Sequence, residues 1–426
     1  MFGATVLVPL LTGLDIATTL LMAGLGTLLF HLITKGKVPA FLGSSFAFLG
    51  GYGAIAPMLE NNTPNHELLP YACLGVACAG LVYLVLAACI KIAGVSRVMR
   101  FFPPVVTGPI IISIGLSLCG SAKTNCDTNW LIALCALAIV IIFNIWGKGM
   151  LKIIPILLGV VASYVFSMIV DAPTRATLVE HVSQAAWIGL PVKWENTALS
   201  IFGNNFDGGM LVTAIITIMP IALATMVEHI GDICAISSTV GANFIADPGL
   251  HRTLLGDGLA TSIASLFGAP ANTTYGENTG VLALTRVYDP LVIRLAAVYA
   301  IIASFCPKFA ALVSAMPTGT IGGVSLILYG MISAIGVRNL VENRVDLAKS
   351  RNVIVVSLII SLALGITFST AGAITFHVGE FTLNFSGLAV AAIVGIVVNA
   401  ILPGKDYNFQ NDYEYGKTTE DHGQML

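Results

Sequence analysis

The stretch Pro270-Ala-Asn-Thr-Thr-Tyr-Gly-Glu-Asn-Thr-Gly-Val-Leu-Ala-Leu-Thr285 interrupts a strongly apolar region and decides how the chain folds. Its first residues favour an extended backbone, whereas residues 279–285 have the composition of a helix. A helix is therefore expected to begin near Glu277 at membrane depth. Its unpaired amides and the positive end of its dipole would favour a carbonyl oxygen or a carboxylate there. The stretch predicts a membrane segment that is broken to form a binding site.

A second interruption occurs early in the chain, at Gly43-Ser-Ser-Phe-Ala-Phe-Leu-Gly-Gly51. It is expected to offer further free amides around Phe46. Each interruption is followed by a similar pattern of Pro and Gly, at residues 102–115 and 316–330. Transporters are often built from two inverted repeats whose broken helices meet at the bilayer midplane. The matching positions therefore predict an internal repeat with short extended breaks in its third and tenth segments.

The composition of the 426-residue chain fits a protein embedded in lipid. Only 10% of its residues are charged, against roughly a quarter in soluble domains, and 56% are hydrophobic. The mean hydropathy is +0.90, so most of the surface must face lipid and a soluble enzyme is excluded. A net charge of −2 leaves no basic surface for nucleic acid, and the apolar content excludes a disordered chain. The eight cysteines form no CxxC pair, so we expect no metal site.

About 20 apolar residues are needed to cross ~30 Å of hydrocarbon as a helix. The chain contains thirteen such segments and one initial half segment, which predicts an all-α polytopic membrane protein of 14 transmembrane segments with the first one truncated. Seven segments in each half would make the two repeats inverted. The predicted segments are residues 2–11, 14–33, 38–56, 71–93, 105–120, 129–147, 151–170, 208–237, 253–267, 275–285, 290–316, 321–335, 353–370 and 385–402.

These segments divide the chain into four parts. We expect a first repeat at residues 1–170, an interfacial connection on the outer face at 171–205, a second repeat at 206–402 and a polar tail at 403–426. Lys and Arg accumulate on the cytoplasmic side of membrane proteins. With the chain start placed inside, all of the 20 Lys and Arg residues fall in inward loops except Lys123, Arg175, Lys193 and Lys308. The asymmetry predicts a cytoplasmic carboxyl terminus.

Four acidic residues lie in apolar surroundings: Glu228, Asp232, Asp257 and Glu277. Buried charges in membrane segments are costly, so such residues are candidates for function. The spacing of four places Glu228 and Asp232 on one helical face, while His229 is rotated by about 100°. A packing role stays open for Asp232, His229 and Asp257. Two carboxylates near one ligand repel each other, so one should hold a proton near neutrality and could couple proton entry to substrate entry.

A site with amide donors from two broken helices and carboxylate acceptors from Glu228 and Glu277 suits a small planar ligand. Pyrimidine and purine bases have the required alternation of N–H and C=O groups. Phe46, Tyr275 and Tyr329 are candidates to cover the apolar faces of such a ring. Aromatic residues in membrane segments also serve in packing, and only the positions near the breaks distinguish these three.

The residues around Glu277 also resemble a known family. Glu277-Asn278-Thr-Gly280-Val-Leu-Ala-Leu-Thr285-Arg286 is similar to the signature of the nucleobase–ascorbate transporters, an acid or amide followed by Asn, a spacer, Gly, four residues, Thr and a basic residue. Further stretches look like the uracil permease branch, and the resemblance extends from Met1 to about Leu402. They begin at Lys37, Glu228, Asp247 and Gly322 and read KVPAFLGSSFAF, EHIG, DPGLHR and GGVSLILYG.

The resemblance implies fourteen spans in two inverted repeats of seven, a core domain that holds substrate, a gate domain, and proton-coupled uracil import. It implies that Glu228 and Glu277 accept the N–H groups of the base, that the amides of Phe46 and Gly276 meet its carbonyls, and that Tyr329 lies on the gate side. Glu277 stands where purine-selective relatives carry Gln, which favours uracil over xanthine.

The chain departs from the family pattern in two places. The family has a full first span with a Gln-His pair upstream of the point that matches Met1. Members also vary between His and Asp at the position of Asp232, so the proton relay of a His-containing member does not transfer to this chain.

The predicted function is a proton-coupled uracil symporter of the cell inner membrane, with a symporter for xanthine, urate or another nucleobase as the alternative. The expected partners are uracil, protons and membrane lipid, with a homodimer as an option, and no cofactor beyond the coupling proton. An intramembrane aspartyl protease was the enzyme considered. Tyr288-Asp289 and Leu255-Gly256-Asp257 superficially resemble the two motifs of such a protease. However, Leu254 stands where the second motif requires Gly, and the two motifs occur here in reversed order. A channel or receptor without coupling is separated from a symporter by saturable, protonophore-sensitive uptake.

Overall fold

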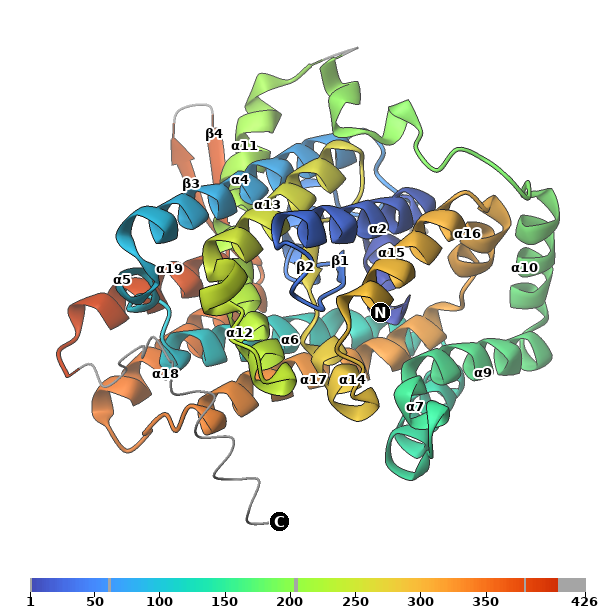
Figure 1. The fold of residues 1–426 in the computed structure, drawn as a ribbon. Coiled ribbons are helices and arrows are strands. Elements are labelled where there is room, and N and C mark those ends of the chain that lie inside the picture. Colours follow the sequence, from blue (N-terminus) through green and yellow to red (C-terminus); the bar gives the residue numbers. More distant parts are fainter. Residues whose placement is uncertain (1, 60–62, 203–205, 379–380, 405–426) are drawn as a thin grey trace.

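The computed structural model describes residues 2–59, 63–202, 206–378 and 381–404, and most of this chain is α-helical (Figure 1). Within this part, six helices are long and apolar enough to cross a membrane. They confirm a helical protein with several apolar spans. The six are α2 (Ile16–Ile33), α4 (Leu69–Ala93), α6 (Pro104–Asp127), α11 with α12 (Gly208–Val240), α17 (Thr318–Glu342) and α18 (Ser350–Thr367).

Shorter helices complete the bundle, and three of them, α7, α9 and α19, are apolar over 10–17 residues. The predicted segment at residues 290–316 is not one straight span, because its two helices meet at an angle of 89°. Pro307 begins the second of them, where a proline cannot continue the preceding helix. The shorter helices are α1 (Phe2–Thr12), α5 (Val95–Met99), α7 (Trp130–Trp146), α8 (Met150–Ile153), α9 (Pro155–Val170), α13 (Leu250–Leu266), α15 (Pro290–Ser304), α16 (Pro307–Ser314) and α19 (Gly387–Ile401).

Two short strands lie at the predicted interruptions, near the middle of Figure 1. β1 (Leu42–Ser44) pairs antiparallel with β2 (Asn272–Thr274), and Gly43 faces Thr273 in the register. Both strands are buried. Each is followed by a helix, α3 (Leu49–Ile55) after β1 and α14 (Gly276–Thr285) after β2. The pairing therefore brings two breaks that are far apart in the sequence to one place.

The helices pack in two groups. In the first, α13 packs against α2 and α4, α15 packs against α2, and α2 and α13 contact the paired strands. In the second, α6 and α17 pack along each other and are flanked by α7 and α18. Glycines permit the close contacts in both groups. A Cβ on Gly80 of α4 would lie 2.7 Å from the carbonyl oxygen of Gly258 of α13, and a Cβ on Gly115 of α6 would lie 2.3 Å from that of Tyr329 of α17.

A second pair of strands, which forms a hairpin, was not predicted and corrects the all-α expectation. β3 (Ala373–Val378) pairs with β4 (Phe381–Ser386) where the last predicted segment was expected to begin. The helix α19 starts only at Gly387, because the hydroxyl of Ser386 accepts a hydrogen bond from the amide of Ala389 and caps it.

The connection predicted at residues 171–205 contains α10 (Ala172–Gln184) and two 3-10 helices, Trp194–Asn196 and Ala198–Phe202. Trp187 and Trp194 are exposed, and the ammonium of Lys308 lies 5.2 Å from the centre of the Trp187 ring. Of the predicted tail at 403–426, residues 405–426 lie outside the described part of the chain.

Candidate functional site

The site is organised around the start of α14. Tyr275 occupies the N-cap position, and its side chain does not cap the helix. Its hydroxyl instead donates a hydrogen bond of 2.8 Å to the carbonyl oxygen of Ser44 in β1. Gly43 makes this possible, since a Cβ there would lie 2.6 Å from the Tyr275 ring. The first amides of α14 therefore receive no hydrogen bond from the side chain of Tyr275. The Tyr275 ring is instead held against β1, at the first break.

Asp232 and Gly276 meet directly at this point. A Cβ on Gly276 would lie 2.9 Å from Oδ1 of Asp232 and 3.1 Å from Cδ1 of Ile335 in α17. The hydroxyl of Thr274, two residues earlier in β2, donates a hydrogen bond of 2.9 Å to Oδ2 of Asp232. The carboxylate of Asp232 is therefore held beside the beginning of α14.

A His–Asp pair continues this cluster into the protein. Nδ1 of His229 lies 3.4 Å from the Thr274 hydroxyl and 2.9 Å from Oδ2 of Asp257. His229 and Asp257 are both fully buried. The sequence left a packing role open for both, and the structure joins them to Asp232 through Thr274. Glu228 is half-buried, one helical turn before Asp232 on α12.

Phe46 and Tyr329 form an aromatic pair between the first break and α17. Their ring centroids are 5.4 Å apart at 81°, an edge-to-face contact, and both side chains are buried. Phe46 precedes α3, which begins at Leu49. Its amide thus lies in the turn between β1 and α3.

The signature residues have different surroundings. The side chains of Asn278 and Thr279 are buried, and neither Asn278 Nδ2 nor Thr279 Oγ1 has a hydrogen-bond partner among the described residues. Gly280 is exposed. Thr285 donates a hydrogen bond of 2.9 Å to the carbonyl of Val281, and Arg286 ends the helix with φ of 55°. The structure describes the backbone of Glu277 in α14, and the predicted contacts of its side chain lie outside what it describes.

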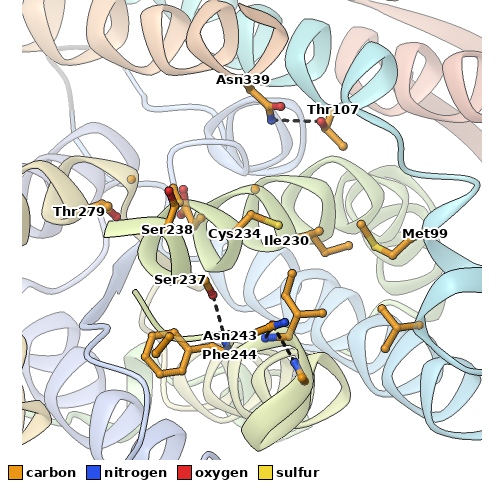
Figure 2. Close-up of a pocket in the computed structure, with 18 of the residues that line it drawn as sticks. Met99, Thr107, Ile230, Cys234, Ser237, Ser238, Asn243, Phe244, Thr279 and Asn339 are labelled. Carbon is orange, nitrogen blue, oxygen red and sulfur yellow. Dashed lines mark hydrogen bonds between the residues drawn. The ribbon is translucent and has the colours of Figure 1, made fainter. Parts of the chain in front are cut away.

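A cavity of about 1310 Å³ leads from the surface to this cluster (Figure 2). Its inner end is formed by the buried Asp232 and Thr279 and by Gly276. Its outer part carries charged residues that are largely exposed. These are Lys37, which is paired with Asp247, and Arg338, whose Nε lies 2.6 Å from Oε1 of Glu342. The hydrogen bond from Lys37 is the main cause that lowers the pKa of Asp247.

Thr107 of α6 and Asn339 of α17 also line the cavity, and Asn339 Nδ2 donates a hydrogen bond of 3.2 Å to the Thr107 hydroxyl. No sequence pattern distinguishes the side chains of Thr107, Thr274 and Asn339 as members of the site. All three are uncharged, and only tertiary packing brings them to the site. Among the described residues, no group of three or more His, Cys, Asp and Glu side chains could hold a metal ion.

Comparison with known proteins identifies close relatives. The Permease family matches residues 1–372. The uracil permease of Bacillus caldolyticus is 41% identical, with 97% of this chain and 92% of the relative covered. The uracil permease of Bacillus subtilis (strain 168) is 38% identical with 99% and 93% covered, and that of Escherichia coli (strain K12) is 37% identical with 94% and 88% covered.

Two solved transporters share the fold at low sequence identity. The transmembrane domain of the cyanobacterial bicarbonate transporter BicA aligns with a TM-score of 0.53 at 12% identity and covers 93% of both chains. SLC26A9 aligns with a TM-score of 0.61 at 12% identity, covering 94% of this chain and 63% of that one. Together, the signature at the start of α14, the apolar helices and the near full-length relatives show that the chain is a transporter of the nucleobase–ascorbate family, in its uracil permease branch.

Proposed function

We propose that the chain imports uracil together with protons by alternating access. The observation that carries the proposal is the cavity that ends at Asp232, Gly276 and Thr279, where the signature helix begins. A ligand in this cavity reaches the first turn of α14 and a buried carboxylate at the same time. The relatives that share the chain over nearly its whole length are named uracil permeases, which supports uracil as the substrate.

In the proposed site, Glu228 and Glu277 accept hydrogen bonds from the two ring N–H groups of uracil. The amides of Phe46 and Gly276 donate to its two carbonyl oxygens. The uncapped start of α14 supports the donor role of Gly276, because helix amides without a side-chain cap are ready to bind an acceptor. The aromatic pair of Phe46 and Tyr329 and the ring of Tyr275 supply apolar surface for the planar base.

Proton coupling is assigned to Glu228 and Asp232. A proton on this pair removes negative charge from a site that lies in a region of low dielectric, which makes the loaded carrier easier to move. The hydrogen bond from Thr274 to Asp232 supports this role, since it links the carboxylate to the strand that precedes the substrate helix. The cavity then provides the aqueous path by which the proton leaves.

The proposal includes fourteen segments in two inverted repeats, residues 1–170 and 206–402, joined by an outer connection at 171–205. The helix packing supports it, because helices at equivalent positions of the two repeats make equivalent contacts. The contact between α2 and α15 corresponds to that between α13 and α4, and α7 with α17 corresponds to α18 with α6. The first helix group would be the core, and the group of α6, α7, α9, α17, α18 and α19 would be the gate.

The cavity lies between these two groups, with α12 and α14 on one side and α6 and α17 on the other. Its outer part carries Lys37 and Arg338, two of the residues that the charge asymmetry places inside. We therefore assign the described conformation as open to the cytoplasm, with the carboxyl terminus on the same side of the inner membrane.

The test is uptake of radiolabelled uracil by cells that lack uracil transport and express this chain. Uptake that is saturable, abolished by a protonophore and unaffected by excess unlabelled xanthine is expected. Uptake that persists when the proton gradient is collapsed would contradict proton coupling. Full competition by xanthine would contradict the selectivity assigned to Glu277 and favour a broader nucleobase symporter.

A further inference from the structure

We infer that Thr107 and Asn339 form a second binding station for the nucleobase on the gate wall of the cavity. This station, called here the Thr107–Asn339 pair, would receive the base when it leaves α14 and before it enters the cytoplasm. The inference rests on the proposed function, because it concerns the release route of the same substrate. None of the sequence signals points to either residue.

The Thr107–Asn339 pair has a defined geometry. Nδ2 of Asn339 donates a hydrogen bond of 3.2 Å to the hydroxyl of Thr107, and Nδ2 of Asn343 donates one of 3.0 Å to Oδ1 of Asn339. These two contacts orient the amide of Asn339. In Figure 2 the pair lies above the helix α12, which carries Ile230, Cys234 and Ser238. The pair therefore faces the cavity from the gate side with its polar groups in fixed positions.

The pair lies against α12, next to the residue that carries the carboxylate of the proposed site. A Cβ on Gly231 would be 3.5 Å from Nδ2 of Asn339 and 3.6 Å from Cδ1 of Ile111. Gly231 precedes Asp232, whose carboxylate touches the start of α14. A base that leaves the start of α14 along the cavity therefore passes α12 and reaches Asn339, which lines the same cavity.

Apolar side chains beside the pair can support a flat ring. Ile111 lies next to Asn339 near Gly231, and Ile335 lies one helical turn before Asn339 on α17, near Gly276. Both line the cavity. A planar ligand can therefore rest on these isoleucines with its polar edge toward the Thr107–Asn339 pair, as is typical of small-molecule sites that combine apolar walls with a few polar groups.

The chemistry of the pair matches the edge of a cyclic imide or lactam. A carboxamide offers both donors and an acceptor, and a hydroxyl offers one donor and two acceptor lone pairs. An adjacent N–H and C=O of a pyrimidine can hydrogen-bond to such groups at the same time. Asn339 donates to Thr107 and accepts from Asn343, so neither the hydroxyl of Thr107 nor the amide of Asn339 is left without a partner. The station also has no charge, which keeps binding weak enough for release.

The test measures exchange of radiolabelled uracil in membrane vesicles of known orientation, with the half-saturating concentration determined separately on each side. Asn339→Ala and Thr107→Val are expected to raise this concentration about five- to tenfold on the cavity side. This is the change in affinity expected when one hydrogen bond to the ligand is lost. On the opposite side the change is expected to stay within about twofold, because the outward-facing site does not include the pair. Thr107→Ser should restore the wild-type value, since it restores the hydroxyl.

Ser238→Ala is the matched control, because Ser238 lines the same cavity on an exposed part of α12. It is expected to leave both concentrations unchanged. Equal changes on the two sides in the Asn339 and Thr107 variants, or no change on the cavity side, would overturn the inference. Wild-type vesicles without any uracil exchange would overturn the proposed function itself, so the two failures are distinguishable.

Discussion

At the scale of single residues, Gly276 is a tightly constrained position of the site. The carboxylate of Asp232 approaches it from one side and the side chain of Ile335 from the other. Asp232 is also held by the hydroxyl of Thr274, so it has little freedom to retreat. Any side chain at Gly276 must therefore displace either the carboxylate or the start of α14.

We expect Gly276→Ala to lower uracil uptake by about tenfold or more, because it shifts groups that must stay in register with the substrate. The initial uptake rate, normalised to the amount of protein in the membrane, measures the effect. Gly365→Ala is the control, since no atom lies within 4 Å of a Cβ built at Gly365 in α18. Unchanged uptake in Gly276→Ala would show that Asp232 and α14 need not be in contact.

Asp247 allows a prediction on pH. Its pKa is lowered from the usual 3.8 mainly by the hydrogen bond from Lys37. A carboxyl group with a lowered folded-state pKa contributes stability above its unfolded pKa, and this contribution is lost as the pH falls through the lowered value. The thermal midpoint of Asp247→Asn should therefore be below that of the wild type near neutrality, by a small amount because the pair is exposed.

The measurement is the unfolding temperature of both detergent-solubilised proteins as a function of pH. The difference between them should stay constant between about pH 5 and pH 8 and shrink as the pH falls below the normal range of the carboxyl group. A difference that grows under acid conditions would contradict the assignment of the ion pair.

The residues of the site could be predicted only in part. The spacing of Glu228 and Asp232 on one helical face, and the position of Gly276 after an extended run, are properties of local sequence. The contact of Tyr275 with Ser44 joins residues 231 positions apart. No local pattern contains such a contact, and the same holds for Thr107 and Asn339, which are separated by 232 positions.

At the scale of elements, the crossing of α6 and α17 shows how the gate group is held together. Gly108 and Gly115 of α6 and Gly336 of α17 lie at the contact, and each would place a Cβ within 3.1 Å of a backbone atom of the other helix. The hydroxyl of Ser333 in α17 also donates a hydrogen bond of 3.1 Å to the carbonyl oxygen of Ile112 in α6. The glycines therefore allow the backbones of the two helices to approach each other closely.

Gly115→Ala is expected to destabilise this crossing by about 1–3 kcal/mol, the usual cost of overpacking. The added carbon would lie 2.3 Å from the carbonyl oxygen of Tyr329. The midpoint of thermal unfolding in detergent should fall accordingly. Gly330→Ala on the exposed side of α17 meets no atom within 4 Å and should not lower the midpoint. Equal behaviour of the two variants would contradict a tight helix contact.

The elements themselves were predicted better than their ends. The positions of α4, α6 and α17 could be predicted because a helix that crosses lipid needs a long apolar segment. This requirement can be read from each segment without knowledge of its neighbours. The bend between α15 and α16 was missed because the two helices together are apolar enough for one span. The hairpin of β3 and β4 was missed because most of it lies between the predicted segments 353–370 and 385–402, where no element was expected. The direction of a helix after Pro307 is set by its neighbours, and hydropathy does not record direction.

At the scale of the whole molecule, the cavity is lined by α12 and α14 together with α6 and α17. Ser238, on the exposed part of α12, lines it, while Thr124 near the end of α6 is exposed and lies beside Lys123, which is predicted to be outside. The proposed orientation places these two residues in different aqueous spaces.

This assignment can be tested in a variant whose eight free cysteines have been replaced. A cysteine introduced by Ser238→Cys should react with a membrane-impermeant maleimide in inside-out vesicles, because the cavity admits solvent from the cytoplasm. One introduced by Thr124→Cys should react only in right-side-out vesicles. Labelling of both from the same side would contradict the proposed orientation.

The pairing of β1 with β2 has a consequence for how such a protein can evolve. Each strand is the hydrogen-bonding partner of the other. A shift of one residue in either strand would turn its side chains to the wrong face. Insertions and deletions near one break are therefore tolerated only if the other break compensates. The two parts of the gene must change together, and neither can be duplicated, exchanged with a relative or lost without removing the site from both.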